Sequence, residues 1–150
     1  MKAVPFIFAL CALFAACNNQ PQPSQPWIVG TWELIAATST AQDSTVSTFD
    51  PKTRMIKIIN PTHFAFLSHS IDKTSDSAAN AFSAGGGTYT LADSIYTEHL
   101  DFFGDKKWEN LSFSFVVKLT GDTLVQKGVE KNEKIGVDHI IVETYKRVKN

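Results

Sequence analysis

Cysteine is nearly absent from the sequence. Only two of its 150 residues are cysteines, Cys11 and Cys17, and both lie near the amino terminus. The chain beyond Cys17 therefore has no thiol with which to form a disulfide. The domain that follows must be held together by core packing alone.

Two further absences each remove a class of function. Lys and Arg number 14 against 15 Asp and Glu, and no segment gathers basic residues, which argues against a nucleic-acid partner. The most apolar run, Pro5–Ala16, is too short to cross a bilayer as a helix.

Signals for catalysis or metal binding are also missing. The four histidines are His63, His69, His99 and His139, and no two of them share a predicted strand face at the spacing of metal ligands. No Ser-His-Asp order or carboxylate pair stands out either. We therefore expect no enzyme activity, no catalytic residue, no metal site and no cofactor. A haem protein with His139 as the ligand is an open alternative, which visible absorbance tests.

The first 16 residues have the pattern of a secretory signal, with Lys2 before the apolar run and small residues at its end. Leu13–Cys17 resembles a bacterial lipobox, although Phe14 is bulkier than the leucine usual at that position. We predict cleavage before Cys17 and a lipid on Cys17 that attaches the protein to a membrane. The alternative is an ordinary cleaved signal followed by a chance cysteine.

Residues 17–26 form a predicted tether. Three prolines alternate with polar residues in Gln20–Pro26, a composition that favours an extended chain and cannot build a core. No acidic run follows Cys17, so we expect the protein in the cell envelope, lipid-anchored in the outer membrane and facing the periplasm. Residues 27–150 have room for one domain with a single core.

Short alternating segments separated by turn residues fill this domain. They predict an all-β, antiparallel, up-and-down β-barrel of about 8–10 strands. Residues 39–47 are predicted to be a loop. Asp76–Ala84 is rich in alanine and is followed by three glycines, which predicts a short helix or a lid at a barrel mouth; a solvated loop is the alternative. The predicted strands cover residues 32–38, 53–60, 63–68, 88–92, 95–99, 111–119, 123–128 and 139–148.

The period-two rule assigns side chains to the inner face. A three-residue turn at Asn60–Thr62 places Ile58 opposite Phe64 and Ile56 opposite Phe66, so these four are predicted inside. Two-residue turns elsewhere give four more predicted pairs: Leu91 with Tyr96, Tyr89 with Glu98, Leu119 with Leu124, and Val117 with Gln126.

The inward set contains the candidate cavity residues. Eight of the eleven phenylalanines lie in the domain, and they serve either a packed core or a ligand cavity. Glu98 is either part of a self-satisfying network or the polar end of a cavity, and the inward amide of Gln126 must find partners or water. The candidates are Phe64, Phe66, Tyr89, Tyr96, Glu98, Phe113, Phe115, Gln126 and Glu143.

The ends of the domain suggest how the barrel closes. Gly30-Thr31-Trp32 opens the first strand and Arg147 ends the last, so in a closed barrel Arg147 can lie over the Trp32 indole, a cation–π contact of about 0.5–2 kcal/mol. A turn glycine before a core tryptophan is the simpler interpretation of the same residues.

This pairing resembles the lipocalins and, more closely, lipocalin-like lipoproteins of uncharacterised function from Gram-negative bacteria of the Bacteroidetes type. The resemblance extends to Lys57-Ile58-Ile59, Thr62-His63-Phe64, Gly86–Leu91, Tyr96-Thr97-Glu98 and Glu143–Arg147. It implies a lipocalin-like barrel but no activity. The chain lacks the cysteines of true lipocalins, so no ligand follows from the resemblance.

Two functions fit these features. The first is a lipid-anchored cell-envelope protein whose lipocalin-like barrel binds a small apolar or amphipathic molecule. The alternative is a non-catalytic structural or protein-interaction module of the envelope with a filled barrel. The inward phenylalanines serve both equally well, so cavity volume separates the two.

Overall fold

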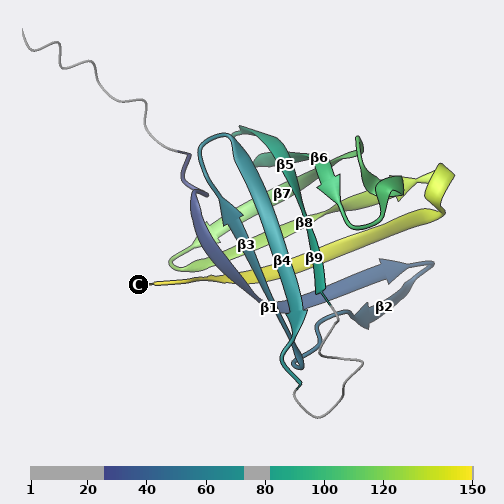
Figure 1. Ribbon diagram of the computed structural model, residues 1–150, viewed down its shortest axis with the longest axis horizontal. Coiled ribbons are helices and arrows are strands. Elements are labelled where there is room, and N and C mark those ends of the chain that lie inside the picture. The colour runs from purple at the N-terminus through teal and green to yellow at the C-terminus, as the bar shows by residue number, and fades with distance from the viewer. Residues whose placement is uncertain (1–25, 73–81, 150) are drawn as a thin grey trace, which may run out of the picture.

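The computed structural model describes residues 26–72 and 82–149 (Figure 1). The predicted signal at residues 1–16, the lipid site at Cys17 and residues 17–25 of the tether lie outside the described residues. Residues 76–81 of the predicted helix or lid lie outside them too.

The described chain is an all-β antiparallel barrel, as the alternation predicts. The elements are β1 (Gly30–Ala41), β2 (Ser44–Ser47), β3 (Thr53–Ile59), β4 (His63–Ser70), β5 (Phe82–Ala92), β6 (Ile95–Phe103), η1 (Lys106–Trp108), β7 (Ser112–Thr120), β8 (Thr123–Asn132), η2 (Glu133–Ile135) and β9 (Val137–Arg147). Eight strands form a closed ring because β1 pairs with β3 on one side and with β9 on the other, and β2 is added beside β1. The short 3₁₀ helices η1 and η2 lie in the connections between β6 and β7 and between β8 and β9.

Trp32 and Arg147 are directly paired across β1 and β9. The Arg147 guanidinium carbon lies 4.0 Å from the indole ring centre, and its Nη1 donates to the carbonyl of Val29 at 2.9 Å. Gly30 makes room for this contact, since its φ of 151° disfavours other residues and a Cβ there would overlap the guanidinium. The first and last strands thus meet at one end of the barrel (Figure 1).

The segment before β1 seals that end. Ile28 is fully buried, and its carbonyl accepts a 2.8 Å hydrogen bond from the Trp32 indole nitrogen.

No helix among the described residues has the length and apolar character needed to cross a membrane.

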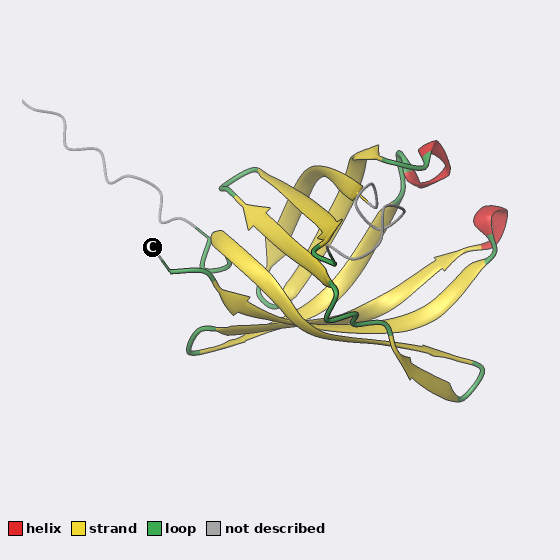
Figure 2. Ribbon diagram, turned by 60° about the horizontal axis from the view of Figure 1, so that its bottom comes forward, coloured by secondary structure: helices red, strands yellow, loops and turns green. Residues whose placement is uncertain are grey.

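The predicted loop at residues 39–47 is wrong, because β1 continues to Ala41 and returns as β2. Gln42 and Asp43 have φ values of 47° and 64°, the signs that a tight type I′ hairpin turn requires. The Ser- and Thr-rich flanks, which suggested a loop, pair as strands from Thr38 with Ser47 to Ala41 with Ser44. The resulting hairpin extends beyond the ring of strands (Figure 2).

The predicted register of β3 and β4 is wrong by one residue. Ile59 lies opposite Phe64, and Lys57 lies opposite Phe66. The turn has two central residues rather than three, because Asn60 N–H donates to the carbonyl of His63 and the Asn60 side chain accepts from two turn amides. A one-residue slip exchanges the two faces of a strand.

The exchange reverses four side chains of β3. Ile56 and Ile58, predicted inside, face outward, and Ile58 is exposed. Lys57 and Ile59 face inward and are buried instead. Phe64 and Phe66 of β4 keep the predicted face.

The glycines at 85–87 lie within β5 and do not end a helix. The helix predicted at Asp76–Ala84 is therefore wrong for residues 82–84, which are part of β5. The pairing of β5 with β6 shifts at Gly86 and Gly87, which bends the strand. A Cβ on Gly85 would lie 2.6 Å from the Phe66 ring. Glycine is therefore needed where this ring packs across β5.

Candidate ligand-binding site

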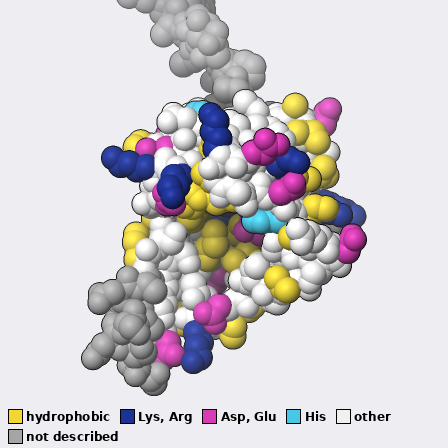
Figure 3. Space-filling model, turned by 90° about the vertical axis from the view of Figure 1, so that its right-hand side faces the viewer, with side chains coloured by type: hydrophobic (Ala, Val, Ile, Leu, Met, Phe, Trp, Pro, Cys, Tyr) yellow, Lys and Arg dark blue, Asp and Glu magenta, His cyan; other side chains and the backbone are white. Residues whose placement is uncertain are grey.

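The end of the barrel opposite Trp32 and Arg147 is open. It contains a cavity of about 180 Å³, and Figure 3 shows a hollow with hydrophobic side chains inside it. The two 3₁₀ helices lie at this same end (Figure 2). The cavity is lined by Met55, Lys57, Phe66, Glu98, Leu100, Phe103, Trp108, Phe113, Gln126, Glu130, Ile141 and Glu143.

Four aromatic rings form one continuous wall of the cavity. Phe66 contacts Phe103 with ring centres 5.7 Å apart, Phe103 stacks on Trp108 at 5.4 Å, and Trp108 contacts Phe113 at 5.8 Å. Trp108 reaches this position from η1, where Asp105 caps the helix by accepting from the amide of Lys107. We call these four residues the aromatic wall.

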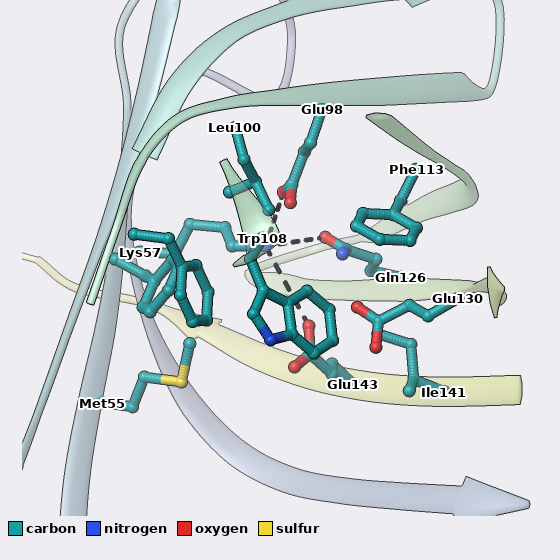
Figure 4. Close-up of a pocket in the computed structure, with 12 residues that line it drawn as sticks. Met55, Lys57, Glu98, Leu100, Trp108, Phe113, Gln126, Glu130, Ile141 and Glu143 are labelled. Atoms are coloured by element: carbon teal, nitrogen blue, oxygen red, sulfur yellow. Dashed lines mark hydrogen bonds and ion pairs between the residues drawn. The ribbon is translucent and has the colours of Figure 1, made fainter. Parts of the chain in front are cut away.

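The base of the cavity is a buried polar cluster built around Lys57. The Lys57 ammonium donates to Glu98 Oε1 at 2.8 Å and to Gln126 Oε1 at 3.0 Å, and Glu143 Oε2 lies 4.0 Å away (Figure 4). Lys57, Glu98 and Gln126 are only 2%, 7% and 2% exposed. We call these four residues the polar cluster.

Opposing effects act on the Lys57 ammonium. Burial alone would lower the pKa of Lys57, but the nearby carboxylates of Glu98 and Glu143 outweigh it, so the pKa is raised above its ordinary value of 10.5. At an effective dielectric constant of about 20, charges 4 Å apart attract by about 4 kcal/mol. Lys57 also lies 5.2 Å from the centre of the Tyr145 ring. It therefore stays charged within the barrel.

Two tyrosines border the polar cluster on the side of the closed end. Tyr145 donates from its hydroxyl to Glu143 Oε2 at 2.7 Å, whereas the Tyr96 hydroxyl, which is also buried, has no hydrogen-bond partner among the described residues. Burial, followed by the adjacent carboxylates, raises the pKa of both phenols. Both tyrosines are therefore neutral at physiological pH.

A third carboxylate, Glu130, lies beside the cavity and bonds outward to His139 at 2.8 Å. Burial raises the pKa of Glu130; the hydrogen bond to His139 opposes this shift, and the nearby Glu143 and Glu98 carboxylates add to it. Negative charge is thus concentrated around the cavity.

The structure distributes the predicted cavity residues over two levels of the barrel. Five of them line the cavity: Phe66, Glu98, Phe113, Gln126 and Glu143. Phe64, Tyr96 and Phe115 are buried in the core cluster instead, and Tyr89 packs against that cluster while its hydroxyl donates to the carbonyl of Asn60. The predicted pairs Tyr89 with Glu98 and Val117 with Gln126 are confirmed.

Sequence reasoning missed the other lining residues. Lys57 was missed because the register of β3 was wrong, although an inward Glu98 and Gln126 demand a partner that donates hydrogen bonds. Phe103 and Trp108 lie between the strands predicted at residues 95–99 and 111–119, and Glu130 lies where β8 runs past its predicted end. Met55, Leu100 and Ile141 were also missed.

The outer surface has an apolar groove of about 570 Å³ over β4, β5 and β6. Phe102, which lines it, is 70% exposed, and Phe82 of β5 is 65% exposed.

The histidines are scattered: His63 and His99 lie on the outer face, and His139 bonds to Glu130. The described residues contain no group of three His, Cys, Asp or Glu side chains that could hold a metal ion.

Comparison with known proteins adds a family without an assigned activity. A family described as a domain of unknown function (DUF4488) matches residues 27–150, the whole predicted domain. No curated protein matches the sequence.

Proposed function

The chain belongs to the DUF4488 family, and from this premise we propose that it is a non-catalytic binding protein whose barrel holds a small amphipathic molecule at its open end. The observation that carries this proposal is the composition of the cavity. One side is the aromatic wall and the base is the polar cluster. Binding pockets for small molecules combine mostly apolar walls with a few polar groups that fix orientation.

The cavity volume limits the size of the ligand. An apolar cavity of about 150 Å³ accommodates benzene, so the roughly 180 Å³ here suit about one ring with a polar substituent. A larger molecule would have to extend through the mouth past Trp108. A long acyl chain does not fit within the barrel.

We also propose that a lipid on Cys17 holds the protein in the cell envelope, at the outer membrane and facing the periplasm. The lipobox-like Leu13–Cys17 supports this assignment. The described chain enters the barrel at the closed end, beside Trp32 (Figure 1). A tether attached there would leave the cavity open on the side away from the membrane. Mass spectrometry of the membrane-extracted protein tests the lipid, and an unmodified Cys17 contradicts it.

Native mass spectrometry of the purified full-length chain tests ligand binding. We expect complexes with one-ring amphipathic molecules and, because Trp108 lines the cavity, partial quenching of tryptophan emission on their addition. The Met55→Trp variant should block binding because Met55 lines the cavity, whereas Leu67→Trp on the outer face should not. Apo protein alone with every probe, or equal binding by both variants, contradicts the proposal.

A protein-interaction module is the second candidate, and the exposed Phe82 and Phe102 favour it. Large exposed apolar patches on soluble domains mark interaction sites. Here Phe102→Ser should abolish capture of an envelope partner while Met55→Trp leaves capture unchanged. Capture that survives Phe102→Ser contradicts this candidate.

A further inference from the structure

We propose that the cavity selects a small organic cation, a protonated amine carried on an apolar body about the size of one ring. This inference rests on the proposed binding function and specifies the charge of its ligand. It is carried by the charges, the aromatic rings and the carboxylate oxygens around one cavity.

The first argument is the charge of the lining. Three carboxylates face one ammonium: Glu98, Glu130 and Glu143 against Lys57. Counting His139 as an imidazolium still leaves the group negative. An anionic ligand, such as a fatty acid, could use Lys57 only by approaching these carboxylates, and Lys57 is already bonded to Glu98 and Gln126.

The second argument is the set of atoms left for a ligand. Among the described residues, the contacts of the Glu143 carboxylate with Tyr145 and Lys57 both use Oε2. Oε1 of Glu143 can therefore accept from a ligand. An ammonium group offers up to three donors and no acceptor, which matches this set.

The third argument is the aromatic wall. Trp108 is stacked on Phe103 and lines the same cavity as the carboxylates of Glu130 and Glu143 (Figure 4). Cations are attracted to aromatic faces, most strongly to tryptophan and most strongly where water is excluded. A cation between the indole and the carboxylates interacts favourably with both, while its apolar body contacts Phe66 and Phe113.

The fourth argument comes from the buried groups next to the cluster. The Glu98 carboxylate lies next to the buried Tyr96 hydroxyl and helps to raise the pKa of Tyr96, after burial. The pKa of Glu130 is raised first by burial; the hydrogen bond to His139 opposes this shift, and the charges of Glu143 and Glu98 add to it. The carboxylates around the cavity therefore act on one another, and a cation among them would reduce this repulsion.

The test uses four probes of nearly equal shape at neutral pH: benzylammonium, benzyl alcohol, benzoate and toluene. Titration calorimetry and ligand-observed NMR on the full-length chain give their affinities. We expect benzylammonium to bind about tenfold or more tightly than benzyl alcohol, a ratio of the size expected for one desolvated cation–π contact. Benzoate should bind most weakly.

Variants assign the selectivity to the cavity. Glu143→Gln and Glu130→Gln should each reduce the preference for benzylammonium over benzyl alcohol, whereas the exposed Glu133→Gln is a matched control and should not. Using two carboxylates keeps the test decisive if one variant fails to fold, which circular dichroism reports.

Each outcome has a defined meaning. Equal or tighter binding of benzyl alcohol or benzoate overturns the inference and leaves the binding function standing. An unchanged preference in both cavity variants also overturns it. Failure of all four probes, toluene included, overturns the proposed binding function together with the inference.

Discussion

The closed end and the open end of the barrel bury different kinds of side chain. At the closed end, Ile28 and Trp32 are fully buried, and the Arg147 guanidinium lies over the Trp32 indole. At the open end, Lys57 is equally buried but among carboxylates. Apolar burial stabilises a fold, whereas buried ion pairs seldom add net stability. The comparison therefore supports the proposal that the closed end stabilises the fold while the open end binds the ligand.

Two tryptophans give the sharpest test of this division. Trp32→Ala should lower the free energy of unfolding by about 3–5 kcal/mol, since it leaves a large cavity and removes the Arg147 contact. Trp108→Ala should cost only about 1 kcal/mol because it mainly loses ring contacts at the partly exposed mouth. Urea denaturation of both variants measures the difference. Equal losses would show that the open end also holds the fold together.

The polar cluster gives the next test. Lys57→Ala should destabilise the protein by roughly 3–5 kcal/mol, because it leaves the buried carboxylate of Glu98 without its counter-ion. The double variant Lys57→Met with Glu98→Gln should recover most of this loss while abolishing selective ligand binding. If the double variant is no more stable than Lys57→Ala, the cluster contributes to folding itself and the assignment to function fails.

Alkaline pH gives a smaller effect on the same groups. The pKa of all three tyrosines and of Lys57 is raised in the folded state: Tyr89 by burial, Tyr96 and Tyr145 by burial and then by carboxylates, and Lys57 by carboxylates against the opposing effect of burial. Above the ordinary values of 10.0 and 10.5, the folded protein binds more protons than the unfolded chain. The stability contributed by these four groups is therefore fully present below about pH 10 and is lost as pH rises further.

The signature of this linkage is spectroscopic. Tyrosinate absorbance should appear together with the loss of circular dichroism, in one cooperative step above about pH 10. Gradual ionisation of tyrosine in a protein that keeps its native circular dichroism would contradict the raised pKa values.

The barrel was predictable from sequence wherever a two-residue turn sets the register. Asp93-Ser94 and Gly121-Asp122 gave the correct partners for Tyr96 and Leu124. Asn60-Pro61-Thr62 misled because the Asn60 side chain and backbone close a tighter turn than the three turn residues suggest. The sequence of such a turn does not by itself determine how many of its residues stay outside the strand pairing.

The candidate site was predictable only in part, for the same reason. Glu98 and Gln126 stand out as polar residues in apolar alternation. Lys57 does not, because its place among isoleucines is inward or outward according to a register that depends on the partner strand. Trp108 reaches the cavity from a 3₁₀ helix, where no period-two pattern exists to assign it a face.

The hairpin of β1 and β2 also bears on how the molecule behaves in concentrated solution. After Glu33, β1 leaves β3, and from Thr38 it continues with β2 beside it. The outer side of β2 is therefore open to strand addition from another molecule, the usual starting point of fibril growth. It spans four residues, Ser44–Ser47, all exposed and three of them Ser or Thr. An edge this short and polar gives an incoming strand little to pair with, so we expect the barrel to resist association through its sheet.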